Sequence, residues 1–260
     1  MNYNIVKVTM SDIKPLLEQY LKTVNGVTDD FWEEHVMKAE FYQILNEEKA
    51  IGYFAIFHKE KVTQFYLQEQ YLYLAQSVFK EILDNYSIKT AYVSTGDQLL
   101  LSLCLDFQKK IELQAYFFDG TVRGEVRAAE YGRKSFSEMK PEEFEEVKEN
   151  TGYFFETVTR EQVETGEVRL YKLCEKNEIL GYGIIVPNVL RPQYWGIGMI
   201  TLENNRRKGV GRSIQLHLAD ICRENGFIPV SGCWYYNHLS KKTIESAGRY
   251  TKTRLLNVIF

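Results

Sequence analysis

The sequence lacks the apolar runs of a membrane protein and the ligand spacing of a metal protein. Its longest hydrophobic stretches fall well short of the roughly 18–20 residues that a transmembrane helix needs, and its first ten residues do not show the basic and then apolar pattern of a signal peptide. The four cysteines form no C-x-x-C pair, and the four histidines show no metal-like spacing. These absences predict a cytoplasmic protein with reduced thiols and no metal site.

A net positive charge is also absent, because 32 Lys and Arg residues stand against 35 Asp and Glu residues, which gives a net charge of -3. A general nucleic-acid binder usually carries a basic surface, so we expect neither nucleic acid nor membrane as a partner. With 45% hydrophobic residues, the chain can bury a large core, either as one big domain or as two domains of about 130 residues.

The two halves of the chain show the same order of expected elements, which is three strands, a helix, a strand and a helix. AIGYFAI matches ILGYGII with Gly52 on Gly181, and TAYVSTGD matches PVSGCWYYN with Asp97 near Asn237. The second half has eleven more positions between these anchors, and we expect them around a glycine-containing corner at residues 203–213. The pattern predicts a tandem repeat.

A boundary between the halves is indicated by residues 119–136, which carry three glycines, three arginines, one lysine and few large aliphatic side chains. Such a shift in composition is typical of a connector between domains, although the same basic charge would also suit a binding strip. The sequence therefore predicts domains at residues 1–125 and 126–260.

The corner ENNRRKGVGRS, residues 203–213, combines glycine with positive charge. Gly209 and Gly211 precede a helical segment and permit positive φ and close backbone approach. The first amides of a helix have no partner within the helix, and they carry a partial positive charge. Four cationic side chains surround these amides: Arg206, Arg207, Lys208 and Arg212. The corner predicts an anion cradle for phosphate or diphosphate.

Two familiar nucleotide loops are excluded by spacing. No G-x-x-x-x-G-K-[ST] occurs, and Ile214 stands where G-x-G-x-x-G needs its third glycine. The remaining pattern, R-x-x-G-x-G at a strand-to-helix junction, resembles the pyrophosphate loop of the GNAT superfamily of N-acetyltransferases. Asn237, Ser240 and Gly248 match that superfamily's offsets after the fifth strand, so the resemblance covers about residues 133–260.

Within the superfamily, the Cys-Trp pair at residues 233–234 is most similar to the zwittermicin A-resistance-type acetyltransferases. The first half resembles a degenerate copy of the same fold without the loop. The resemblance implies an α/β (α+β) protein of tandem GNAT-like domains, each a mixed, largely antiparallel sheet flanked by helices, with the acetyl-CoA loop in the second domain.

The resemblance also implies an activity, namely acetyl-CoA-dependent direct transfer of an acetyl group to a primary amine of a small molecule, by a monomer or homodimer. The diphosphate would lie on the loop, including the amide of Val210, and the pantetheine arm would pair with the preceding strand end: Met199, Ile200 and Thr201. Asn237 would contact the pantetheine or hold the parted strand ends, and it would equally suit a helix cap. Ser240 follows it at the family's small-residue position.

The catalytic groups are less defined, because Ile244 occupies the position where family members often carry a Tyr acid. Tyr235 and Tyr236, at the end of the fifth strand, could protonate the leaving thiolate, since a tyrosine pKa is near ~10; both could also be packing aromatics. Glu203 is a candidate base or a surface carboxylate. A non-catalytic CoA-binding module and an unrelated phosphate-ligand enzyme therefore stay open as alternatives.

Overall fold

The computed structural model describes residues 3–260, which form two compact units. Unit 1 extends to Tyr116 and also contains Lys252–Phe260, whereas unit 2 comprises Phe117–Thr251. The segment Lys252–Phe260 was expected in the second domain and joins the first unit, because its strand completes the sheet there. The boundary expected between residues 125 and 126 stays a prediction, and Met1 and Asn2, with which the predicted first domain begins, lie outside the described residues.

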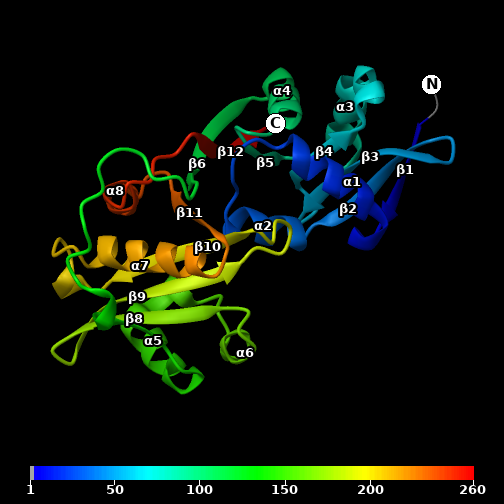
Figure 1. The fold of residues 1–260 in the computed structure, drawn as a ribbon. Coiled ribbons are helices and arrows are strands. Elements are labelled where there is room, and N and C mark those ends of the chain that lie inside the picture. The colour runs from blue at the N-terminus through cyan, green and yellow to red at the C-terminus, as the bar shows by residue number, and fades with distance from the viewer. Residues whose placement is uncertain (1–2) are drawn as a thin grey trace. The chain divides into compact units, whose positions relative to one another are not determined.

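The sheet of unit 1 has the strand order β1-β2-β3-β4-β5-β12. These strands are β1 (Tyr3–Val8), β2 (Glu40–Asn46), β3 (Lys49–Phe57), β4 (Lys61–Leu67), β5 (Thr90–Ser94) and β12 (Thr253–Ile259). Neighbours are antiparallel except β4 and β5, whose parallel ladder joins Lys61 to Thr90 and Val62 to Ala91. The C-terminal strand β12 lies beside β5 (Figure 1).

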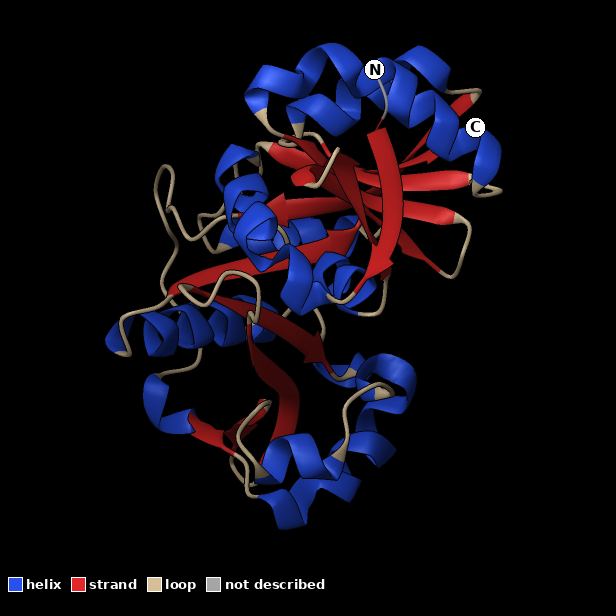
Figure 2. Ribbon diagram, turned by 90° about the vertical axis from the view of Figure 1, so that its right-hand side faces the viewer, coloured by secondary structure: helices blue, strands red, loops and turns tan. Residues whose placement is uncertain are grey.

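Helices cover both faces of this sheet (Figure 2). They are α1 (Met10–Thr23), α2 (Asp30–Met37), α3 (Ala75–Asn85) and α4 (Gln98–Phe107), with a 3-10 helix η1 (Glu69–Leu74) before α3. Because side chains alternate along a strand, Phe54 and Phe65 face α3, where they share a core with Phe79. Tyr53 and Tyr66 occupy the opposite face, and their rings lie 6.0 and 6.3 Å from that of Tyr20 in α1.

The sheet of unit 2 has the order β11-β10-β9-β8-β7. Its strands are β7 (Phe136–Glu138), β8 (Arg169–Glu175), β9 (Glu178–Pro187), β10 (Tyr194–Thr201) and β11 (Ile228–Trp234), and β6 (Lys110–Phe118) crosses the boundary between the units. Its α-helices are α5 (Phe144–Thr151), α6 (Arg160–Glu164), α7 (Val210–Glu224) and α8 (His238–Ser246). The neighbours from β7 to β10 are antiparallel, and β10 and β11 are parallel.

The amphipathic helix α7 covers one face of the unit 2 sheet. Its buried Ile214 and Leu218 share a core with Ile185 of β9 and Ile197 of β10. On the other face, α5 and α6 pack over β8 and β9, where Tyr182 belongs to a second core. Full burial of an aliphatic side chain contributes about 1.5–3 kcal/mol, so this packing holds α7 firmly against β10.

The two glycines aligned in the sequence occupy the same structural position. Gly52 pairs with Ile44 and Gly181 with Leu173, and in each strand the residue before the glycine, Ile51 or Leu180, is the extra residue of a β-bulge. A Cβ at Gly52 would lie 2.2 Å from the Tyr66 carbonyl oxygen, and one at Gly181 would lie 2.5 Å from that of Ile200. Only glycine fits such a close approach of backbones.

The aligned polar residues Asp97 and Asn237 also share one role. The Asp97 carboxylate accepts from Leu100 N at 3.1 Å at the start of α4, and the Asn237 side chain accepts from Ser240 N at 3.0 Å at the start of α8. Such caps satisfy amides that the helix leaves unpaired. The repeat therefore reaches from the third strand of each unit to the cap of its last helix.

The eleven additional positions of the second half are not concentrated at the glycine corner. Helix α7 has 15 residues where α3 has 11, and β9 and β10 are joined by residues 188–193 where β3 and β4 are joined by residues 58–60. The expectation that the corner holds the insertion is therefore wrong, because a longer helix and a longer hairpin loop account for most of it.

Candidate active site

The strands β10 and β11 separate part-way along their length. Their ladder pairs Tyr194–Gly196 with Ile228–Val230, and the Ser231 hydroxyl then donates to the Ile197 carbonyl at 2.9 Å. Beyond this point β10 continues to Thr201 with its ladder to β9 intact. The edge of β10 that faces β11 therefore leaves backbone groups open to a ligand.

Strand alternation identifies which backbone groups these are. The Ile200 carbonyl lies against Gly181 of β9, whereas the Ile197 carbonyl faces β11. Since successive residues of a strand direct their N–H and C=O groups to opposite sides, Met199 and Thr201 present theirs to the parted edge. Of the three predicted strand residues, Ile200 has its backbone directed to β9.

A tight turn leads from β10 into α7. It contains a 3-10 helix η5 (Glu203–Asn205) and two positive φ angles, 65° at Arg207 and 80° at Gly209. Ser213 N donates to the Gly209 carbonyl at 3.0 Å. Among residues 3–260, no acceptor serves the three amides before it, Val210 to Arg212, as expected for the first turn of a helix. These N–H groups form the donor cluster that the sequence predicts.

The cationic side chains of the corner divide into two groups. Arg206, Arg207 and Lys208 are exposed on the turn; Arg206 lies 3.8 Å from Glu203, and Lys208 donates to the Asn205 side chain at 3.2 Å. Arg212 is only 10% exposed, and its Nε donates to the Ala128 carbonyl at 3.2 Å. Three of the four predicted cations are thus available to a ligand, while Arg212 is engaged with the preceding segment.

The glycines of the turn are enclosed by neighbouring atoms. A Cβ at Gly211 would lie 2.9 Å from the Thr243 methyl group, 3.2 Å from the Thr201 hydroxyl and 3.3 Å from the Met199 sulfur. The start of α7 therefore packs directly against the end of β10 and against α8. This packing brings the donor cluster next to the parted strand edge.

The predicted tail residues lie on α8. The Asn237 side-chain oxygen accepts from Ser240 N and so caps this helix. Asn237 therefore has the helix-cap role, and its Nδ2 group remains available for a contact with a ligand. Ile244, at the position of the family's tyrosine, is buried in the same helix. A hydrophobic side chain there cannot transfer a proton.

The two candidate tyrosines follow the end of β11 rather than continuing it. The strand ends at Trp234, whose carbonyl accepts from Asn237 N at 2.9 Å. The ring centroids of Tyr235 and Tyr236 are 5.2 Å apart, and Tyr236 is 55% exposed. Glu203, the candidate base, is almost fully exposed on the turn.

Unit 1 has the same strand arrangement without the donor cluster. Its parallel strands β4 and β5 pair only at Lys61–Val62 and Thr90–Ala91, but η1 runs directly into α3, and Ala75 N donates to the Leu72 carbonyl. No glycine or positive φ occurs between β4 and α3. Unpaired amides flanked by exposed cations therefore occur at the start of α7 in unit 2 and have no counterpart at the start of α3.

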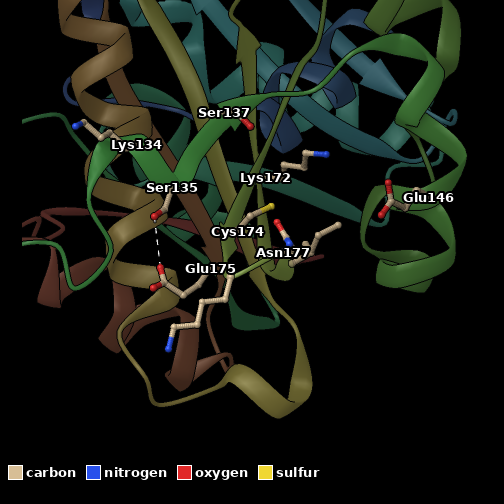
Figure 3. Close-up of a pocket in the computed structure, with 10 residues that line it drawn as sticks. Lys134, Ser135, Ser137, Glu146, Lys172, Cys174, Glu175 and Asn177 are labelled. Atoms are coloured by element: carbon tan, nitrogen blue, oxygen red, sulfur yellow. Dashed lines mark hydrogen bonds between the residues drawn. The ribbon is translucent and has the colours of Figure 1, made fainter.

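A separate open groove of about 570 Å³ lies at the β8–β9 hairpin of unit 2 (Figure 3). Its walls carry Lys134, Lys172, Lys176, Glu146 and Glu175, and it contains none of the predicted site residues. Lys172 already forms an ion pair with Glu143. The mixed charge of this groove defines no ligand class.

Between residues 3 and 260, no helix combines the length and apolar character needed to span a membrane. Over the same residues, no group of three or more His, Cys, Asp or Glu side chains is placed to hold a metal ion.

Family models match both halves of the chain. An acetyltransferase (GNAT) domain model matches residues 9–121, and the acetyltransferase (GNAT) family model matches residues 130–248. No curated protein matches the sequence significantly.

Solved structures share the fold over nearly the whole chain. A GNAT-family acetyltransferase from Colwellia psychrerythraea is 19% identical with a TM-score of 0.86, covering 99% of both chains. A tandem GNAT protein from the clavulanic acid biosynthesis pathway is 11% identical with a TM-score of 0.61, covering 99% of this chain and 98% of its own. A GCN5-related N-acetyltransferase from Sphaerobacter thermophilus is 11% identical with a TM-score of 0.58, covering 98% and 94%.

These comparisons define the class of the protein, which belongs to the GNAT acetyltransferases. More particularly, it consists of two GNAT domains in tandem, each with a mixed, largely antiparallel sheet flanked by helices, as the sequence predicts. The expected closeness to the zwittermicin A-resistance type stays a prediction.

Proposed function

We propose that the protein is an acetyl-CoA-dependent N-acetyltransferase that transfers an acetyl group directly to a primary amine of a small molecule. One observation carries the proposal: unpaired amides at the start of α7, flanked by exposed cations, adjoin the parted edge of β10. Backbone donors at a helix N-terminus favour phosphate groups. An extended ligand with a diphosphate at one end suits this combination.

The residues present fit acetyl-CoA, which supplies an acetyl group activated as a thioester. The amides of Val210, Gly211 and Arg212 would hold the diphosphate, because they have no other acceptor among the described residues. The exposed cations of the turn would neutralise its charge: Arg206, Arg207 and Lys208. Met199 and Thr201 would pair with the amide groups of the pantetheine arm.

The same strand edge would assist the chemistry. An N–H from Met199 or Thr201, held rigidly by the ladder to β9, would donate to the oxygen that gains charge as the amine attacks, an effect often worth several kcal/mol. Positioning the amine next to the acyl carbon contributes further. As the C–N bond forms and the C–S bond breaks, Tyr236 or Tyr235 would protonate the leaving sulfur, and the attacking nitrogen would lose its proton to water or to the exposed Glu203. Asn237 Nδ2 and Ser240 would border the ligand.

We further propose that the protein acts in the cytoplasm as a monomer or homodimer, with neither nucleic acid nor membrane as a partner. Its acidic net charge of -3 supports a small cationic acceptor. Sedimentation of the purified chain would separate the two oligomeric states.

The proposal is tested by charge reversal on the turn. We expect the Arg206→Glu/Arg207→Glu double variant to weaken acetyl-CoA binding by at least about tenfold, since each charge-assisted hydrogen bond contributes ~1.5–3 kcal/mol. The fold should be unaffected, because both side chains are exposed. Substitution of the glycines is less informative, since any side chain there meets Glu130 or Thr243.

The matched control is Arg160→Glu on α6. Arg160 is also exposed and pairs with a glutamate in its own helix, as Arg206 pairs with Glu203. Calorimetric titration with acetyl-CoA, CoA and ATP measures the affinities. Equal affinity of the double variant and the control for acetyl-CoA would exclude the turn as the diphosphate site.

A non-catalytic CoA-binding module is the second candidate, and the buried Ile244 favours it. Both candidates predict the same binding results. Thiol release from acetyl-CoA in the presence of a panel of primary amines distinguishes them, because only the enzyme releases thiol in an amine-dependent manner.

A further inference from the structure

An acidic side chain at the start of the second family match, Glu130, lies against the glycine turn. A Cβ at Gly209 would be 2.9 Å from the Glu130 Cβ and 3.4 Å from its Cγ. The Glu130 carboxylate, on a 53% exposed side chain, lies 3.7 Å from Arg212 Nη2 and 3.8 Å from Arg127 Nη2. A negative charge therefore stands beside the amides that would receive a diphosphate.

Buried hydrogen bonds hold Glu130 in this position. The fully buried Ser213 hydroxyl accepts from Glu130 N at 2.9 Å and from Tyr131 N at 3.1 Å, and it lies 3.0 Å from the Gly209 carbonyl, to which it donates. One helical turn further, His217 Nε2 donates to the Tyr131 carbonyl at 2.7 Å. The same hydroxyl thus joins the backbone of Glu130 to Gly209, the N-cap residue of α7, and movement of this backbone would break these hydrogen bonds.

We propose that Glu130 sets the affinity of the acetyl-CoA site, as a resident carboxylate that opposes the diphosphate at the start of α7. This inference rests on the proposed function. A carboxylate near a helix N-terminus is favourable while no ligand is bound. It also occupies Arg212, and it repels the phosphate groups of CoA and of every acyl-CoA over a few ångströms.

The test is Glu130→Gln, which keeps the Cβ and Cγ that pack on Gly209 and removes the charge. We expect CoA to bind roughly three- to tenfold more tightly to the variant at about 0.01 M salt, and equally tightly to both proteins at about 1 M salt, where screening is nearly complete. The matched control is Glu224→Gln at the far end of α7, where Glu224 is exposed and 3.9 Å from Arg133. The control should bind CoA within about twofold of the wild type, because the 15-residue helix separates Glu224 from the turn by roughly 20 Å, where two unit charges interact about five times more weakly than at ~4 Å.

The salt series separates charge from structure. A merely structural role of Glu130 predicts unchanged or weaker binding by Glu130→Gln at low salt, and either result overturns the proposal. Equal tightening by Glu224→Gln, or a gain that persists at about 1 M salt, overturns it as well. Wild-type protein that binds neither CoA nor acetyl-CoA would refute the proposed function itself. If the wild type binds CoA and the variant shows no gain in affinity, only the proposed role of Glu130 is refuted.

Discussion

Replacing Leu256 by alanine tests whether the C-terminal strand is a structural part of unit 1. Leu256 of β12 lies opposite Val93 of β5, is 7% exposed and shares a core with Val78 and Phe79 of α3. Truncating such a buried leucine costs about 2–5 kcal/mol of the free energy of unfolding. Since 1 kcal/mol lowers Tm by about 2–4 °C in chains of 150–250 residues, we expect the Tm of unit 1 to fall by about 4–20 °C.

Hydrogen exchange read by peptide locates the effect. In Leu256→Ala, amides of β5 (Thr90–Ser94) should exchange faster, while those of β8 (Arg169–Glu175) in unit 2 should change less. The control is Leu239→Ala on α8, whose exposed side chain should cost no more than about 0.5 kcal/mol. Faster exchange in β8 with β5 unchanged would show that β12 supports the other unit and would refute the reasoning.

Two further predictions concern single side chains. Tyr236→Phe should lower kcat about tenfold or more if Tyr236 supplies the proton and leave the Kd for acetyl-CoA unchanged; an unaltered kcat, measured by thiol release, removes it from the mechanism. Burial raises the pKa of Asp97 to about 6. Because this folded-state pKa exceeds the unfolded-state value, the free energy of unfolding should fall as the pH rises from about 4 to about 6, and it should stay at the lower value above pH 6. Asp97→Asn should keep the cap and abolish this fall, gaining roughly 1–3 kcal/mol above pH 7; a variant less stable than the wild type in denaturant titrations at pH 7.5 would contradict the argument.

Local pattern was sufficient to predict the repeated part of the fold. The two short apolar segments align Gly52 with Gly181, and each glycine lies next to a bulge in the third strand of its unit. Asp97 and Asn237 were aligned at the end of the fifth strand of each half, and both cap the next helix. These features depend on neighbours in the sequence, such as a tight approach in a hairpin or a cap within one turn.

The strands β6 and β12 could not be assigned in this way. β12 pairs with β5, which precedes it by more than 150 residues of chain, and its short apolar run at the end of the sequence has no turn signal toward a neighbouring partner. The expected domain of residues 126–260 therefore included a strand that joins unit 1. Pairing over such a distance is decided by tertiary packing and not by local propensity.

The backbone conformation of the candidate site was predictable from the sequence, whereas the positions of its side chains were less so. Glycine spacing identified the turn before α7, because positive φ at Gly209 is a local requirement. Spacing alone could not show that Arg212 turns to the Ala128 carbonyl. Spacing also could not show that Glu130 lies beside the glycine turn. The sequence indicated only that Glu130 belongs to a segment of shifted composition, and this segment lies against α7.

The glycine beside the bulge separates two demands on the sequence of such a domain. Both copies have it, so the close approach of strands that it permits belongs to the fold itself. The turn into the following helix differs between the copies, so the same architecture forms with and without a glycine turn at that point. In a doubled protein of this kind, the scaffold and the recognition loop can evolve at different rates along the same chain.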